Sequence, residues 1–210
     1  MNRQKIAEIF TRFQKANPKP VTELEFTNEF TLLVAVVLSA QATDKGVNKA
    51  TPALFKAANT PQKMVALGED KIRDYVKTIG LFNAKAKNIY LLSKKLVEEF
   101  GGVVPSNLED LQRLPGVGRK TANVVLNCAF GKPTMAVDTH VFRVANRIGL
   151  VKAKDPLQTE LQLLKKIPPE FLFDAHHWLI LHGRYICVAR TPKCRICLIK
   201  DLCEFKQKVL

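Results

Sequence analysis

Apolar residues recur at helical spacing along almost the whole chain, and no segment shows the two-residue alternation of a half-buried strand. Near the N-terminus, Ile6, Ile9, Phe10 and Phe13 fall at positions i, i+3, i+4 and i+7 of a helix. Similar stripes follow at short intervals, and glycine or proline ends most of them. The sequence therefore predicts an all-α protein of about ten short helices.

Capping residues predict where several of these helices begin. Thr60 followed by Pro61 is an N-cap and first-turn pair. Asn83 is placed to cap the long helix that ends at the paired glycines 101 and 102. Ser106 and Glu109 have the spacing of a capping box for a short helix.

Charge and hydropathy narrow the class of protein. Lysine and arginine number 33 against 19 acidic residues, and this net charge of +14 indicates a polyanionic partner, most simply nucleic acid. A hydrophobic content of 47% excludes general disorder. The longest apolar stretch, residues 30–40, is about half of the roughly 20 residues that a membrane span needs. The N-terminus has no secretory signal, so we expect no membrane association and a cytoplasmic location, at the nucleoid through DNA.

A glycine-rich turn lies between two of the predicted helices. It consists of Leu114, Pro115, Gly116, Val117 and Gly118. Backbone N–H groups at such a turn and at the following helix start can bind phosphate without reading base sequence. A nucleotide P-loop is excluded, because it needs a longer run between its first glycine and its Gly-Lys pair. An ordinary interhelical turn is the alternative, but Arg119, Lys120 and the net charge favour phosphate binding.

Two residues beyond the turn are candidates for chemistry. Lys120 falls in the first turn of a helix, where the helix dipole disfavours a cation and favours the neutral, nucleophilic amine. A simple phosphate contact is the alternative for this lysine. Asp138 precedes another helix and is placed to be its N-cap. A carboxylate close to Lys120 would also stabilise a cationic sugar and move protons, but the sequence by itself does not bring the two together.

Four of the five cysteines crowd the C-terminal region in the pattern C-x6-C-x2-C-x5-C. They are Cys187, Cys194, Cys197 and Cys203. Zinc sites usually combine two short C-x2-C pairs, so this single pair favours a [4Fe–4S] cluster, with zinc as the alternative. Arg190 and Lys193, between the first two cysteines, indicate a phosphate-binding finger, or else the loop serves only as a structural clamp. Cys128 stands apart in an apolar segment and is expected to be a small buried side chain.

Taken together, these motifs resemble the endonuclease III family of helix-hairpin-helix DNA glycosylases. The resemblance is carried, in chain order, by Leu38–Asp44 (LSAQATD), Leu114–Ala122 (LPGVGRKTA), Val137–His140 (VDTH) and the cysteine array. It implies two all-α lobes with DNA in the cleft between them. Residues 22–132 would form a helical bundle with the hairpin, and residues 1–21 with 133–210 would form a lobe that holds a [4Fe–4S] cluster on the four cysteines.

The resemblance also implies roles for individual residues. Lys120 would be the nucleophile and Asp138 its catalytic carboxylate. Gln41 and Leu81 match the positions that wedge into the duplex where the base leaves, and an apolar residue in a turn after Gly80 suits that use. The other expected DNA contacts are Leu114, Pro115, Gly116, Val117, Gly118, Arg119, His140, Arg190 and Lys193.

The activity implied is base-excision DNA repair by a bifunctional enzyme. It would remove oxidised pyrimidines and cleave abasic sites by β-elimination through a lysine Schiff base. Its partner would be double-stranded DNA containing damaged pyrimidines or abasic sites, and we expect a monomer. One alternative is a relative of the adenine-mismatch glycosylases, which typically lack a lysine at the position of Lys120 and carry a further C-terminal domain. The other is a non-catalytic helix-hairpin-helix protein that only binds DNA.

Overall fold

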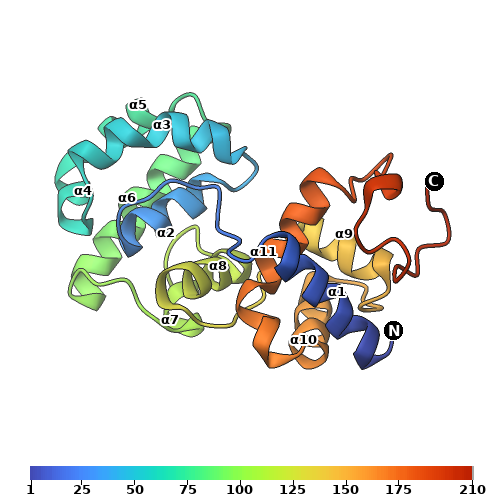
Figure 1. Ribbon diagram of the computed structural model, residues 1–210. Helices are drawn as coiled ribbons and strands as arrows, with labels where there is room; N and C mark the ends of the chain where they lie inside the picture. The colour runs from blue at the N-terminus through green and yellow to red at the C-terminus, as the bar shows by residue number, and fades with distance from the viewer. Residues whose placement is uncertain (210) are drawn as a thin grey trace. The chain divides into compact units, whose positions relative to one another are not determined.

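The computed structural model describes residues 1–209, and every regular element within them is helical. The all-α prediction is therefore confirmed. The chain forms two compact lobes (Figure 1). The central lobe is Thr22–Gly131, and the terminal lobe combines Met1–Val21 with the chain from Lys132 onward. Within residues 1–209, no helix has the length and apolar character needed to cross a bilayer.

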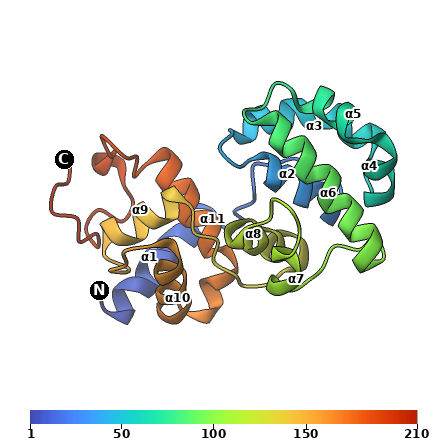
Figure 2. The same cartoon turned by 180° about the vertical axis from the view of Figure 1, so that it is seen from behind.

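The central lobe is built around one helix that is buried almost entirely. This is α2 (Glu29–Leu38), in which every residue from Phe30 to Leu38 is buried. The longest helix, α6, lies alongside α4 and α5 (Figure 2). The other helices of this lobe are α3 (Asp44–Ala57), α4 (Pro61–Leu67), α5 (Glu69–Val76), α6 (Phe82–Phe100), α7 (Leu108–Gln112) and α8 (Arg119–Phe130).

In the terminal lobe the N-terminal helix packs on helices from the far end of the chain. Its elements are α1 (Arg3–Ala16), α9 (Thr139–Ile148), α10 (Pro156–Lys166), α11 (Pro169–Tyr185) and the 3-10 turn η1 (Cys194–Ile196). The Phe10 ring stacks on Phe171 with 5.9 Å between centroids. The indole nitrogen of Trp178 donates to the Asn17 carbonyl at 2.9 Å. Both contacts join α1 to α11, so the two ends of the chain share one core.

Two of the predicted helix starts are wrong. Thr60 caps α4 as predicted, but α7 is capped by Asn107 rather than Ser106, since the Asn107 Oδ1 accepts from the Asp110 N–H at 2.9 Å. Asn83 does not cap α6, because the turn after Gly80 brings the chain into the helix early. The helix begins at Phe82, directly after Leu81 in a left-handed conformation.

Helix α3 is absent from the sequence prediction because a proline interrupts its pattern. Pro52 lies inside the helix, where a proline removes a hydrogen bond and usually breaks or bends the chain. Here its ring is exposed, and buried Val47 and Leu54 hold the helix against the lobe. Thr43 caps it by accepting from the Gly46 N–H at 3.1 Å. Tertiary packing therefore outweighs the local signal.

Helices α9 and α11 approach each other closely at Gly183. A Cβ atom at this position would lie 2.9 Å from the Cβ of His140 and 3.0 Å from a methyl group of Val144. A side chain larger than hydrogen would force the two helices apart. The glycine therefore sets the spacing between the start of α9 and the end of α11.

We expect Gly183→Ala to destabilise the terminal lobe by about 1–3 kcal/mol, because overpacking at a tight contact forces the backbone to shift. The check is the thermal unfolding midpoint. Gly118→Ala is a suitable control, since an added Cβ there meets no atom within 4 Å and its φ of −86° suits alanine. Equal midpoints for the Gly183 variant and the wild type would mean that the contact at Gly183 yields without cost.

Candidate functional site

The glycine-rich turn is a tight hairpin between α7 and α8. The Val117 N–H donates to the Leu114 carbonyl at 3.1 Å and closes the turn. The side chains of these two residues are buried, while Gly116 and Gly118 are exposed. The apolar residues thus anchor the turn and leave its backbone at the surface.

Glycine is required at the tip of this hairpin. Gly116 has a φ of +78°, and a Cβ there would lie 2.9 Å from the amide nitrogen of Asn88 on α6. Gly118 is the N-cap of α8 and makes no side-chain cap hydrogen bond. A helix start of this kind, with backbone donors and no side chain in front of them, is a good site for an anion.

Lys120 lies in the first turn of α8 and is half-buried. Its positive charge reaches the thiol of Cys128, farther along the same helix. Burial raises the pKa of Cys128 to about 11, and the Lys120 ammonium acts against this rise. Cys128 is half-buried rather than fully enclosed, and it is a neutral thiol at physiological pH.

Asp138 is the N-cap of α9, as predicted. Its Oδ1 accepts from the Val141 N–H at 2.8 Å, which fixes the carboxylate at the head of the helix. The side chain is half-buried. Capping uses one carboxylate oxygen and leaves the second for other partners. Lys120 belongs to the central lobe and Asp138 to the terminal lobe.

Gln41 and Leu81, the two residues expected to wedge into DNA, lie on adjoining turns. A Cβ at Gly80 would be 4.0 Å from the Gln41 carbonyl oxygen. Within residues 1–209 they are the only non-glycine residues with positive φ, at 53° and 59°. Gln41 is exposed, and Leu81 has 61% of its surface exposed.

Strained backbone of this kind costs about 1–3 kcal/mol per residue and concentrates at functional sites. Neither turn recovers the cost by burying its side chain. The two turns therefore present an amide and an apolar side chain outward from one place on the central lobe, which suits insertion between bases.

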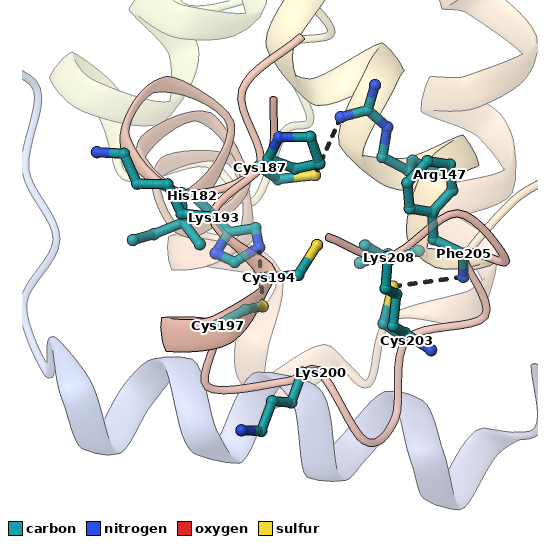
Figure 3. Close-up of a pocket in the computed structure, with 13 residues that line it drawn as sticks. Arg147, His182, Cys187, Lys193, Cys194, Cys197, Lys200, Cys203, Phe205 and Lys208 are labelled. Atoms are coloured by element: carbon teal, nitrogen blue, oxygen red, sulfur yellow. Dashed lines mark hydrogen bonds between the residues drawn. The ribbon is translucent and has the colours of Figure 1, made fainter. Parts of the chain in front are cut away.

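The four C-terminal cysteines line a single cavity in the terminal lobe (Figure 3). All five cysteines of the chain lie within the described residues, and none forms a disulfide. Among the described residues, no three His, Cys, Asp or Glu side chains lie close enough together to bind a single metal ion. Four cations share the cavity wall: Arg147, Lys193, Lys200 and Lys208.

Several donors point at the sulfur atoms. The Phe205 N–H donates to the Cys203 Sγ at 3.4 Å, and Arg147 Nη1 donates to the Cys187 Sγ at 3.7 Å. His182 Nε2 lies 3.7 Å from the Cys197 Sγ. Four thiols around one cavity, with cations and hydrogen-bond donors to sulfur, are a donor set that fits an iron–sulfur cluster.

Burial is unfavourable for bare thiolates in this cavity. It raises the pKa of Cys197 to about 11 and also raises the pKa of Cys203, and the neighbouring thiols act in the same direction. Burial lowers the pKa of His182 to about 4, so its ring is neutral. With its proton on Nε2, a neutral ring donates to the Cys197 sulfur.

Sequence reasoning missed Arg147 and His182 as members of this site. The His182 ring also packs against Phe13, with 5.2 Å between centroids. Its position near the end of α11, five residues before Cys187, was the available signal. Arg147 is distant in sequence and carries no local signal.

The remaining predicted residues lie at the surface of the terminal lobe or partly within it. Arg190 and Lys193 are exposed on the segment between α11 and η1. The Lys193 N–H donates to the Ile186 carbonyl at 2.9 Å, which folds this segment into a compact loop. His140 is half-buried near the start of α9, with its Nδ1 3.3 Å from Arg143 Nη2.

Comparison with known proteins agrees with this geometry. The family model of the HhH-GPD superfamily of base excision DNA repair proteins matches residues 34–169, more than half of the chain. Endonuclease III from Haemophilus influenzae is 59% identical over 100% of this chain and 99% of its own. Endonuclease III from Escherichia coli K12 is 57% identical over the same shares. The chain belongs to the endonuclease III family of the HhH-GPD superfamily.

Solved structures also resemble the chain over almost its whole length. A trapped covalent intermediate of endonuclease III with DNA is 42% identical, with a TM-score of 0.91 over 97% of this chain and 96% of that one. A thermostable thymine-DNA glycosylase is 25% identical, with a TM-score of 0.84 over 96% of both chains. The family resemblance predicted from the motifs is confirmed.

We expect Leu81→Gly to leave the free energy of unfolding unchanged or to raise it by about 1 kcal/mol, because glycine adopts a φ of +59° without strain. Leu81→Val should lower it, since a β-branched residue is poorly tolerated in the left-handed region. Thermal unfolding of both variants is the measurement. If Leu81→Gly proved clearly destabilising, the leucine would be packing against its own lobe rather than being held outward.

Proposed function

We propose that this base-excision DNA glycosylase and abasic-site lyase acts on oxidised pyrimidines, with Lys120 as the nucleophile and Asp138 as the catalytic carboxylate. The observation that carries the proposal is the likeness to an endonuclease III trapped as a covalent intermediate on DNA, over 97% of this chain. Such a trap requires a nucleophile on the protein. Lys120 suits that role because it is an amine at a helix start beside a phosphate-binding hairpin.

The substrate is a nucleotide turned out of the helix. Extrusion costs least for a base that stacks or pairs poorly, and oxidised pyrimidines and abasic sites meet that condition. The hairpin and the basic residues Arg190 and Lys193 hold the phosphates. Gln41 and Leu81 fill the gap that the extruded nucleotide leaves in the duplex.

The Lys120 ammonium first gives up a proton, and the resulting amine attacks C1′ of the deoxyribose while the base departs with the electrons of the glycosidic bond. The second oxygen of Asp138 stabilises the positive sugar and accepts a proton from the amine. The sugar ring opens to a Schiff base on Lys120, which acidifies the C2′ hydrogen. Loss of that proton expels the 3′ phosphate by β-elimination, and water then releases Lys120.

The same proposal assigns a [4Fe–4S] cluster to Cys187, Cys194, Cys197 and Cys203. When bound, the cluster would cross-link the loop that carries Arg190 and Lys193. The arrangement of donors and cations around the cavity supports this ligand set. The reaction above uses side chains of the protein and water.

The two alternatives are less favoured. An adenine-mismatch type of enzyme has no use for a nucleophile at Lys120. A purely DNA-binding module has no use for a half-buried lysine at the head of α8. Reduction with borohydride in the presence of abasic DNA distinguishes a lyase from both, because it traps the Schiff base as a stable amine.

We expect Lys120→Ala to abolish borohydride trapping and strand cleavage while DNA affinity stays close to that of the wild type. The physical reason is that only the amine forms the bond to C1′, whereas the hairpin backbone is unchanged. Trapped complexes are measured by denaturing gel electrophoresis. Lys63→Ala is the control, because that exposed lysine lies on α4 and contacts Asn59 at 3.4 Å. Continued trapping by Lys120→Ala would transfer the nucleophile to another residue.

Arg190→Ala should weaken binding to damaged and undamaged duplexes by the same factor and reduce the slope of log affinity against log salt by about 1. A phosphate contact releases counterions and carries no information on the base. Fluorescence anisotropy over a salt series measures both effects, with Arg73→Ala on α5 as a surface control that pairs with Asp70. A loss confined to one lesion would contradict the phosphate role.

A further inference from the structure

Arg147 has a set of contacts that the proposed reaction does not explain. It extends from α9 and binds the segment that follows α11. Its Nη1 donates to the Val188 carbonyl at 2.7 Å and to the Cys187 sulfur at 3.7 Å. Its Nη2 donates to the Ala189 carbonyl at 2.9 Å. One guanidinium therefore holds three consecutive residues.

The four cysteines lie on one segment, residues 187–203, which we call the cysteine loop. The same guanidinium also contacts the chain just after the last residue of this loop. Its central carbon lies 5.0 Å from the centre of the Phe205 ring, a cation–π contact. The backbone N–H of Phe205 donates to the Cys203 sulfur at 3.4 Å. Figure 3 shows Arg147 reaching Cys187 on one side, with Phe205 beside its guanidinium group. Arg147 thus connects the segments of the first and the last cysteine.

The residue after Ala189 is Arg190, which is exposed. Because Arg147 fixes the two carbonyls immediately before it, the backbone of Arg190 begins from a held position. We propose that Arg147 is a positioning residue that holds the first cluster ligand, Cys187, and the phosphate-binding Arg190 as one unit. This inference rests on the proposed cluster and on the proposed phosphate role of Arg190.

The geometry requires arginine rather than any cation. A guanidinium presents its donors in a rigid planar fork, whereas a lysine ammonium is a single point at the end of a flexible chain. A lysine at position 147 keeps the charge but serves one or two of the three acceptors. Outer-shell donors to metal ligands typically matter by 10–100-fold in affinity or activity.

Arg12, on α1, provides a matched control because it contacts the same cysteine loop at other residues. From α1 it donates to the Leu198 carbonyl at 3.0 Å and to the Asp201 carboxylate at 2.6 Å. It braces the stretch between Cys197 and Cys203, but its contacts are with a carbonyl and carboxylates. Arg12→Lys therefore loosens the loop without touching a cysteine sulfur or the backbone before Arg190.

The first measurement is the loss of the cluster from purified holoenzyme under ferricyanide, followed by visible absorbance and iron content. We expect Arg147→Lys to lose its cluster about 10-fold faster than the wild type. Arg12→Lys should fall well short of that change. A rate for Arg147→Lys equal to that of the wild type overturns the role toward Cys187.

The second measurement is a double-mutant cycle on DNA affinity, using holoenzyme with equal iron content and a duplex that holds a tetrahydrofuran abasic analogue. Arg147→Lys should weaken binding severalfold on its own and much less in the Arg190→Ala background, because the two residues act through one contact. Arg12→Lys should be additive with Arg190→Ala. Additive effects for Arg147→Lys overturn the role toward Arg190.

Two checks keep these outcomes separate. Wild-type protein that contains no iron or sulfide would remove the proposed cluster itself, whereas an intact wild type with an unaffected Arg147→Lys would remove only the present inference. If Arg147→Lys does not fold, Phe205→Leu takes its place. That variant removes the ring beside the guanidinium and keeps the backbone donor to Cys203, and it should change both readouts in the same direction.

Discussion

The close packing of α9 against α11 is the contact on which the terminal lobe depends. Gly183 allows the two helices to approach until no room remains for a Cβ beside His140 and Val144. At that spacing Arg143 reaches the Gly183 carbonyl at 2.8 Å and the Cys187 carbonyl at 3.2 Å, and Arg147, one turn later, reaches the two carbonyls beyond. Asp138 caps α9. The same helix therefore holds this carboxylate and fixes the start of the cysteine loop. Helix α9 thus contacts both the Asp138 carboxylate and the segment that carries Cys187 and leads to Arg190.

In the central lobe, backbone conformation holds the exposed turns in place. In the terminal lobe, arginine side chains hold the cysteine loop. Gly116 allows the hairpin to lie close against the Asn88 side chain, where a Cβ would not fit. Gln41 and Leu81 are kept in left-handed conformations on adjoining turns. A flexible loop would have to lose conformational entropy on each binding event, whereas these turns are ordered beforehand. The strain in the free protein is the cost of that preorganisation.

Much of this arrangement could be predicted from the sequence, and the failures have physical causes. Helical periodicity and caps such as Thr60 and Asp138 are local signals, and the structure confirms them. Pro52 concealed α3 because burial of Val47 and Leu54 outweighs a local helix breaker. The contacts of Arg147 and of Arg12 with the cysteine loop join residues far apart in sequence, so no spacing rule detects them. The roles of Lys120 and Asp138 came from the family motifs, because neither residue carries a local sign of the other.

The division of labour in the proposed function follows from what each contact can distinguish. In the proposed function, backbone donors of the hairpin and the side chains of Arg190 and Lys193 would bind phosphates, which are the same at every nucleotide. Such contacts raise affinity for all DNA and cannot select a lesion.

Selection must therefore arise where normal and damaged nucleotides differ in energy, which is the cost of leaving the stack. A difference of about 1.4 kcal/mol in that cost changes the extruded population tenfold. In the proposed function, the strained turns at Gln41 and Leu81 would act at that step, since a side chain that fills the gap stabilises the extruded state only after the base has left. Uniform binding through phosphate contacts and selective stabilisation by Gln41 and Leu81 are thus complementary in the proposed function. The phosphate contacts would keep the enzyme on DNA long enough for each nucleotide to be tested.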